Sequence, residues 1–256
     1  MSRDEQNMVY GVNAVLEALR AGRRQIETIT ILQSARPDRL KAVLELAREK
    51  GVPVQRVPRL DLDRSLGEAR HQGVVARIAA AHYADADELL DTLAAKVGTP
   101  DPPLVLGLDA IEDPRNMGSM VRTAECAGVH GVFIAERRAV GLTGAVAKVA
   151  AGALEYVPVA RVTNLVRLIE QLKERNIWVV GAAAEAKQTY TEWDWTLPAA
   201  IFLGNEGHGL HRLVREHCDT LVRIPVVGKL DSLNVSVAAG VLLYEARRQR
   251  NSVSRG

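Results

Sequence analysis

The sequence has few cysteines and no long apolar segment, and both absences exclude whole classes of protein. Only two of its 256 residues are cysteine, Cys126 and Cys218, and they lie far apart. This spacing excludes a disulfide framework and a Cys-x-x-Cys zinc ribbon, so we expect two reduced, buried thiols. No apolar run approaches the roughly 18 to 20 residues that cross a membrane, and the first seven residues are polar. We therefore expect a cytoplasmic protein with no membrane partner.

Two common cofactor patterns are also missing. The six histidines include His208, His211 and His217, but spacings of three and six residues do not hold all three on one helix face. We therefore expect no metal. The segment 106–113 follows an apolar run but lacks the Gly-x-Gly-x-x-Gly pattern of dinucleotide-binding proteins.

The charge is nearly balanced overall but unevenly distributed. The net charge is +2, whereas residues 1–82 carry 14 Lys/Arg and 10 Asp/Glu. Residues 83–102 carry 1 and 5, and residues 103–256 carry 18 and 16. The N-terminal excess fits phosphate binding, but an ordinary solvated surface explains it equally well. By charge alone, Arg20, Arg23 and Arg24 are candidate RNA contacts.

The N-terminal part reads as a small α/β domain over residues 1–80. Apolar residues at helical spacing predict helices over 12–19 and 36–50, and alternating residues predict strands over 26–31, 52–57 and 73–80. Residues 81–102 are expected to be a linker that contains a helix over 85–96 and ends in a proline-rich breaker.

Residues 103–256 predict a larger α/β domain with a parallel sheet. The run 104–108 is continuously apolar, which is typical of a strand buried on both faces. Helices and strands alternate after it, which favours a parallel sheet covered by helices. The expected strands are 131–135, 156–159, 177–182, 199–203 and 221–224, and the expected helices are 117–127, 164–175, 210–217 and 234–248. The last helix is apolar nearly all round, so we expect it to be buried.

Three polar segments stand out in this second domain. In 113–124, Asn116 occupies the place of a helix N-cap, and Arg122 falls opposite the helix's apolar stripe, where it could bind a phosphate or simply pair with Glu125. The glycine-rich segment 204–209 connects a strand to a helix, where open α/β sheets bind ligands. In 232–236, Ser232 or Asn234 could cap the next helix or face a ligand. Trp193 and Trp195 fit core packing better than base stacking.

Together, in this order, the segments resemble the SpoU/TrmH family of RNA ribose methyltransferases. The matching residues are Asn116-x-Gly-x-x-x-Arg-Thr-Ala124, Gly204-Asn-Glu-Gly-x-Gly-Leu210, Ile224-Pro and Ser232-Leu-Asn-Val-Ser236. Upstream, 9–19 and 71–75 resemble the L30e-like RNA-binding domain of members that methylate a guanosine in large-subunit rRNA. The match spans nearly the whole chain.

The resemblance implies a fold, a cofactor and site residues. It implies a C-terminal trefoil knot, S-adenosylmethionine as cofactor, a homodimer, and 23S rRNA or a large-subunit assembly intermediate as partner. Arg122 becomes the catalytic residue, with Asn116, Glu206, Ser232 and Asn234 organising the site, although an arginine is a poor proton acceptor, and water or Glu206 could serve instead. The implied cofactor residues are Gly204, Asn205, Ile224, Pro225 and Leu233.

The sequence leaves two alternatives open. The same chemistry could modify another rRNA or tRNA nucleotide, although the N-terminal domain argues against the minimal tRNA enzymes. A catalytically inactive RNA-binding protein is the alternative of a different class, and the intact set of Arg122, Glu206 and Asn234 argues against it.

Overall fold

The computed structural model describes residues 8–22, 24–35, 37–66, 71–78 and 82–253. The chain forms two units. The first consists of residues 1–82 and 141–156, and the second of residues 83–140 and 157–256. The second unit thus begins before the helix that we had assigned to the linker, and the first unit contains a segment from the C-terminal half.

The first unit is a four-stranded sheet with helices packed against it. Its elements are β1 (Met8–Tyr10), α1 (Val12–Ala21), β2 (Ile26–Leu32), α2 (Pro37–Glu49), β3 (Val54–Val57), α3 (Arg59–Leu66) and β4 (Val74–Ile78). The strand order is β1-β4-β2-β3, with β4 antiparallel to both neighbours and β3 parallel to β2. Side chains from β2, β4, α1 and α2 form one apolar core. The predicted helices and strands of this region are confirmed where the structure describes them, and residues 36, 79 and 80 of these predictions lie outside the described residues. The elements β1 and α3 were not anticipated.

The segment 141–156 joins this unit through α6 (Gly144–Ala150) and the 3₁₀ helix η2 (Ala153–Glu155). Glu155 is 2% exposed and accepts hydrogen bonds from Arg24. The Tyr156 hydroxyl donates to Glu17 over 2.7 Å. Arg24 therefore has a structural role inside the first unit, where its side chain is 12% exposed, and its candidacy as an RNA contact rests on charge alone. Arg20 pairs with Glu17, and Arg23 lies outside the described residues.

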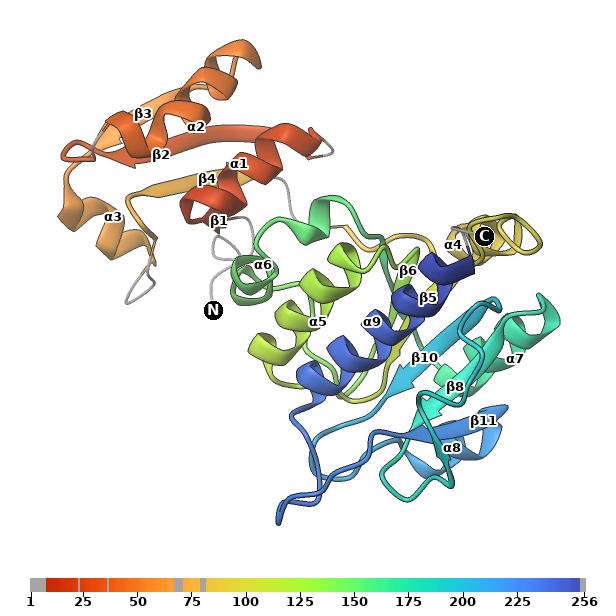
Figure 1. The fold of residues 1–256 in the computed structure, drawn as a ribbon. Helices are drawn as coiled ribbons and strands as arrows, with labels where there is room; N and C mark the ends of the chain where they lie inside the picture. The colour runs from red at the N-terminus through yellow and green to blue at the C-terminus, as the bar shows by residue number, and fades with distance from the viewer. Residues whose placement is uncertain (1–7, 23, 36, 67–70, 79–81, 254–256) are drawn as a thin grey trace. The chain divides into compact units, whose positions relative to one another are not determined.

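The second unit is a parallel seven-stranded sheet (Figure 1). Its order is β7-β6-β5-β10-β8-β11-β9, and every pair is parallel. The strands are β5 (Leu104–Leu108), β6 (Gly131–Ala135), β7 (Val159–Val162), β8 (Trp178–Ala182), β9 (Gln188–Thr189), β10 (Ala199–Leu203) and β11 (Thr220–Arg223). The helices are α4 (Ala86–Ala94), α5 (Pro114–Cys126), α7 (Leu165–Glu174), α8 (Arg212–His217) and α9 (Val235–Val253). The parallel α/β prediction is confirmed.

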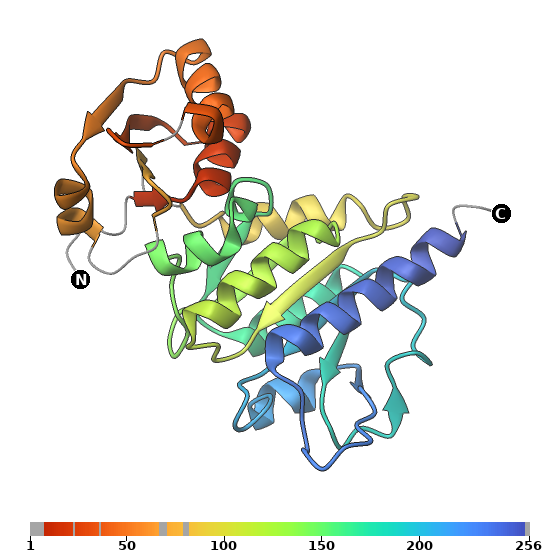
Figure 2. The same cartoon turned by 60° about the vertical axis from the view of Figure 1, so that its left-hand side comes forward.

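Helices cover both faces of this sheet. Leucines of α4 and α7 pack with Phe133 and Phe202 in one core cluster, which α8 joins through Val214. On the other face, α5 and α9 lie side by side across the central strands (Figure 2). A Cβ atom on Gly240 of α9 would stand 3.8 Å from Thr123 of α5, so the two helices approach closely there.

Several detailed expectations need correction. The α9 helix is not buried all round, because Val237 and Tyr244 are 52% and 54% exposed. Cys126 is exposed and Cys218 half-buried, although burial raises the pKa of both thiols, that of Cys218 to about 12. Strand β7 begins at Val159 and leaves Tyr156 outside it. Trp195 is fully buried, as predicted, and donates to Tyr190 O.

None of the described helices is long and apolar enough to cross a membrane.

Candidate active site

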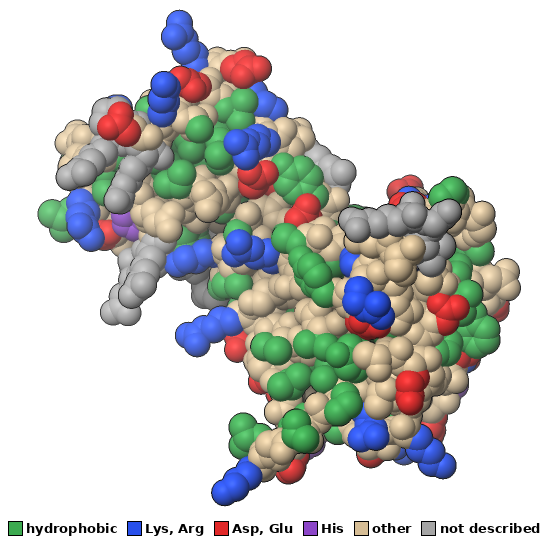
Figure 3. All heavy atoms as spheres, in the orientation of Figure 1, with side chains coloured by type: hydrophobic (Ala, Val, Ile, Leu, Met, Phe, Trp, Pro, Cys, Tyr) green, Lys and Arg blue, Asp and Glu red, His purple; other side chains and the backbone are tan. Residues whose placement is uncertain are grey.

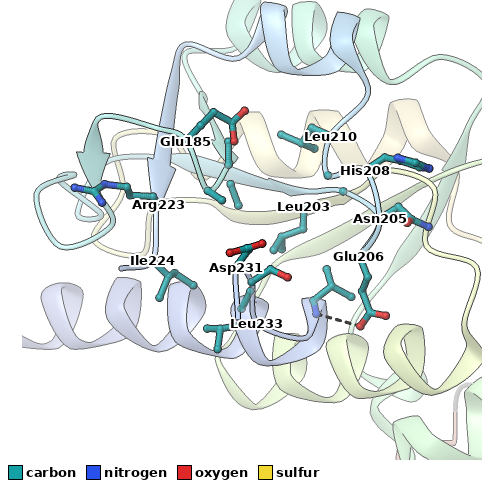
Figure 4. A pocket seen from close by; sticks show the side chains of 18 of the residues that line it. Glu185, Leu203, Asn205, Glu206, His208, Leu210, Arg223, Ile224, Asp231 and Leu233 are labelled. Carbon is teal, nitrogen blue, oxygen red and sulfur yellow. Dashed lines mark hydrogen bonds between the residues drawn. The ribbon is translucent and has the colours of Figure 1, made fainter. Parts of the chain in front are cut away.

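A cavity of about 380 Å³ lies where several parallel strands end. Strands β8, β10 and β11 each lead into one of its walls, and the start of α9 closes it (Figure 4). Parallel sheets present loops and helix N-termini at this edge, which is where they bind ligands. The lining comprises Ala182–Glu185, Leu203–Leu210, Arg215, Val222–Ile224, Val226, Asp231–Leu233, Val235 and Ala238.

The segment Gly204–Leu210 forms a closed turn, and we call it the cofactor loop after the role that the family resemblance implies for it. Gly209 N donates to Asn205 O over 2.8 Å, and Gly207 N donates to the Asn205 side chain over 2.7 Å. A Cβ on Gly204 would stand 2.0 Å from the Gly209 carbonyl, and Gly209 itself has φ +65°. Both positions require glycine, because a side chain would clash at the first and the second is left-handed. The predicted tight connection is therefore real, and it also forms a cavity wall.

The three sequence motifs meet in one hydrogen-bond network. The Asn116 amide donates to Glu206 Oε1 over 3.0 Å, and the Asn234 amide donates to Asn116 Oδ1 over 3.0 Å and to Glu206 Oε1. Glu206 Oε1 also accepts from Val235 N over 3.3 Å, drawn as the dashed line in Figure 4. One carboxylate oxygen thus joins α5, the cofactor loop and the start of α9.

Asn234 has two roles at once. Its Oδ1 accepts from Ser236 N and Val237 N over 3.0 and 3.3 Å, which caps α9 as predicted. Its Nδ2 makes the contacts to Asn116 and Glu206. The capping and site interpretations are therefore compatible, because an asparagine side chain offers an acceptor and two donors.

Asn116 is not the N-cap of α5, and that prediction was wrong. Asp113 is the cap, and its side chain accepts from Arg115 N over 2.8 Å with Pro114 at the first helical position. Asn116 lies one turn further in, 8% exposed, where its side chain can reach the network. The Asp-Pro pair carried the signal for this earlier start.

Arg122 lies on a different side of the same helix. It is six residues after Asn116, which corresponds to about 9 Å along the axis and about 240° around it. Its side chain is exposed, and within the described part of the chain it makes no hydrogen bond or ion pair, including with Glu125. Arg122 therefore does not join the network of Asn116 within this chain.

Most of the predicted site residues gather at the cavity. Gly204, Asn205, Glu206, Ile224, Ser232 and Leu233 line it, and Asn116 and Asn234 adjoin it through the network. Arg122 and Pro225 are outside the lining. Sequence reasoning missed the loop Ala182–Glu185 and the carboxylate of Asp231. The first was detectable because it follows the carboxyl end of a predicted parallel strand.

The lining combines apolar walls with separate charged groups. Leu203, Leu210, Ile224 and Leu233 supply apolar surface, and backbone groups of the cofactor loop supply donors and acceptors. Glu185 pairs with Arg215 at one part of the wall, and Asp231 contributes another carboxylate. Such a cavity suits a flat ring with a polar, positively charged extension. The described residues contain no cluster of three His, Cys, Asp or Glu that could hold a metal.

Known proteins match the chain over almost its full length. A putative TrmH family tRNA/rRNA methyltransferase of Bacillus subtilis is 46% identical over 97% of this chain and 98% of its own. A Shewanella oneidensis protein named 23S rRNA (guanosine-2′-O-)-methyltransferase RlmB is 43% identical over 97% and 99%. The crystal structure of the SpoU methyltransferase AviRb from Streptomyces viridochromogenes, in complex with AdoMet, has a TM-score of 0.78 and 28% identity, covering 96% of this chain and 90% of that one.

Two family models divide the sequence much as the two units do. The model described as RNA 2′-O ribose methyltransferase substrate binding matches residues 8–84. The model of the SpoU rRNA Methylase family matches residues 103–244, which include the cavity and the network. The chain belongs to the SpoU rRNA methylase family.

Proposed function

We propose that this protein transfers a methyl group from S-adenosylmethionine to a ribose 2′-hydroxyl in large-subunit rRNA. The network of Asn116, Glu206 and Asn234 carries the proposal, because it joins all three motifs beside the cavity. An RNA-binding protein without catalysis would have no need of that arrangement.

S-adenosylmethionine is the cofactor, and the cavity fits it. Leu203, Leu210 and Ile224 supply an apolar wall that would hold its adenine, and the cofactor loop would offer backbone donors and acceptors. Asp231 and the Glu185–Arg215 pair suit its charged amino-acid end. The bound cofactor supplies an electrophilic methyl group on a positively charged sulfur. The AdoMet-bound AviRb structure supports this assignment.

The ribose is placed by residues of the first motif. In-line transfer requires the 2′-oxygen to approach the methyl carbon opposite the carbon–sulfur bond and to lose one proton. Arg122 is the catalytic residue, and it holds the ribose and its phosphate through its guanidinium. Glu206 orients Asn116 and the start of α9. Ser232 in the lining and Asn234 beside it would shape the site around the bound cofactor. The proton leaves to water or to Glu206, because the guanidinium that holds the phosphate is already protonated.

The substrate is a guanosine of 23S rRNA, either in free RNA or in an assembly intermediate. An enzyme that acts on this substrate would work in the cytoplasm. The Shewanella relative named as RlmB supports the nucleotide, and the substrate-binding model over residues 8–84 supports an RNA partner. Residues 1–80 bind that RNA and residues 103–256 catalyse, and α4, which lies between these two ranges, packs on the sheet of the catalytic unit. The C-terminal segment after β11 forms a trefoil knot, which fits the return of α9 past β10 to pack on α5.

The active enzyme is a homodimer formed through α5 and α9. Apolar side chains gather over α9 and on the loop before it (Figure 3). Val237 and Tyr244 are seven residues apart on one face of α9, and Val227 and Leu230 of the loop are 104% and 78% exposed. An apolar surface of this kind marks a protein interface. A partner there would also meet Arg122, which makes no hydrogen bond or ion pair with the residues that the structure describes.

The dimer is tested by placing a charge on this face. Val237→Asp with Tyr244→Asp should convert the protein to a monomer in light scattering and abolish methyl transfer. Leu60→Asp, at an exposed leucine of the first unit, is the matched control and should stay dimeric. A monomeric wild type would exclude the dimer.

The activity is tested with purified protein, methyl-labelled S-adenosylmethionine and a 23S rRNA transcript. Label should appear on a ribose, and nuclease mapping should locate it at a guanosine. Arg167→Ala, at an exposed arginine of α7, should leave the transfer unchanged, whereas Arg122→Ala should abolish it. Absence of ribose label with assembly particles as well as transcript would refute the proposal. Label on tRNA alone would identify the alternative substrate.

A further inference from the structure

A buried carboxylate outside the cavity holds the far end of the cofactor loop. Asp109 directly follows β5 and is 4% exposed. Its Oδ2 accepts from His211 N over 2.7 Å, and its Oδ1 lies 2.9 Å from His211 Nδ1. Burying a carboxylate is costly unless it is hydrogen-bonded, so these contacts to one residue form a strong attachment.

The next residue of the same strand end holds the near end of the loop. The Asn205 amide donates to Ala110 O over 3.1 Å. Ala110 has φ +56°, a left-handed conformation that a residue with a side chain rarely adopts, and it is buried. Asp109 N also donates to Leu203 O over 2.9 Å, which continues the pairing of β5 with β10.

Two consecutive residues therefore anchor both ends of the cofactor loop to a neighbouring strand. Between the anchors the loop closes on itself through the bond from Gly209 N to Asn205 O. With residues 205 and 211 fixed, little freedom remains for the backbone that lines the cavity. Neither Asp109 nor His211 is part of the lining, so any effect on a ligand passes through the loop.

We propose that Asp109 is a positioning residue that preorganises the cofactor loop for S-adenosylmethionine, with His211 as its partner. The His211 backbone N–H provides the main attachment, and the imidazole, which is half exposed, adds a second. Preorganisation removes the ordering cost from binding, so it raises cofactor affinity without touching the reacting atoms. This inference rests on the proposed function only in naming the cofactor.

Three variants separate the attachments. Asp109→Ala removes both contacts to His211, the one to its backbone N–H and the one to its ring. Asp109→Asn keeps an acceptor for the backbone N–H, and His211→Ala removes only the imidazole ring. Binding of S-adenosylmethionine is measured by titration calorimetry below the unfolding midpoint of each protein, and kcat and KM are measured with rRNA. We expect Asp109→Ala to raise the cofactor Kd and KM about 10-fold, and the other two variants about threefold. The kcat at saturating cofactor and the KM for RNA should stay within about twofold of wild type.

The split between affinity and turnover distinguishes positioning from general damage. A misfolded or loosened protein would lose kcat, RNA binding and thermal stability together, and Asp109→Asn would not rescue it. A folded Asp109→Ala protein with unchanged cofactor Kd would overturn the proposal. If Asp109→Ala does not fold, wild-type affinity in both Asp109→Asn and His211→Ala overturns it instead. Absence of cofactor binding by the wild type would refute the proposed function, a different outcome.

Discussion

The two ends of helix α5 carry residues of the same sequence motif in opposite surroundings. At the N-terminal end, Asn116 is 8% exposed and bonded to Glu206 and Asn234. Six residues later, Arg122 is exposed and, within the described chain, makes no hydrogen bond or ion pair. Under the proposed function, the cofactor side of the site is complete in one chain, whereas the side that meets RNA needs the partner subunit.

Helical geometry explains the division. Met117, Met120, Val121 and Ala124 are all fully buried. With these on the sheet side, Asn116 falls toward the strand ends and Arg122 falls away from them. Cofactor binding and methyl transfer should therefore respond separately to substitutions at the two ends.

Replacing Arg122 should have the largest effect. Arg122→Ala removes the guanidinium that holds the ribose, so kcat should fall at least about 100-fold. The unfolding midpoint and the cofactor Kd should not change, because this side chain contacts neither the core nor the cavity. Calorimetry and single-turnover transfer measure the two quantities on one preparation. A large loss of cofactor affinity would show that the two ends are not independent.

Mixing two impaired variants should raise activity above that of either one if the site needs both protomers. In a mixed dimer of Arg122→Ala and Glu206→Ala chains, one site keeps Arg122 from one protomer and Glu206 from the other. Random exchange makes half of the dimers mixed, so about one quarter of wild-type activity should return. Mixing either variant with itself is the control. No recovery after verified subunit exchange would place Arg122 and Glu206 in the same protomer's site.

Substitution of Glu206 should have a smaller effect that reaches both ends. Glu206→Ala removes the acceptor for Asn116, Asn234 and Val235 N, so the cofactor Kd should rise about 10-fold and kcat should also fall. Glu206→Gln keeps an acceptor oxygen and should recover most of the affinity. A Gln variant with normal affinity but lost turnover would instead identify Glu206 as the proton acceptor.

The sequence predicted the sheet well because buried parallel strands have a local signature. The runs at β5 and β10 are continuously apolar, and the structure buries every residue of both. The glycine-rich loop and the segment of Ser232 and Leu233 could also be placed together, because loops that follow parallel strands lie at the same edge of the sheet. Recognition of the three motifs then identified residues whose individual roles were ambiguous.

Long-range packing set the limits of prediction. No local sequence pattern indicates that Glu155 pairs with Arg24, 131 residues away. The packing of residues 141–156 within the first unit could therefore not be predicted. Asn234 was ambiguous because the same side chain both caps a helix and donates to Glu206. Asp109 drew no attention because its partner, His211, lies on another strand's loop.

Thiol labelling of Cys126 should give the smallest effect and tests the exposed end of α5 directly. Cys126 follows Arg122 by four residues on the same helix face and is exposed in the single chain. Burial raises the pKa of Cys218 to about 12, so that thiol should react little, and Cys218→Ser removes it entirely. In the Cys218→Ser protein, an increase in protein concentration from the monomeric to the dimeric range should slow maleimide labelling of Cys126 about threefold. The Val237→Asp, Tyr244→Asp protein should label at the faster rate at every concentration. Equal rates in dimer and monomer would mean that the partner leaves this face of α5 open, so Arg122 would have to meet RNA without it.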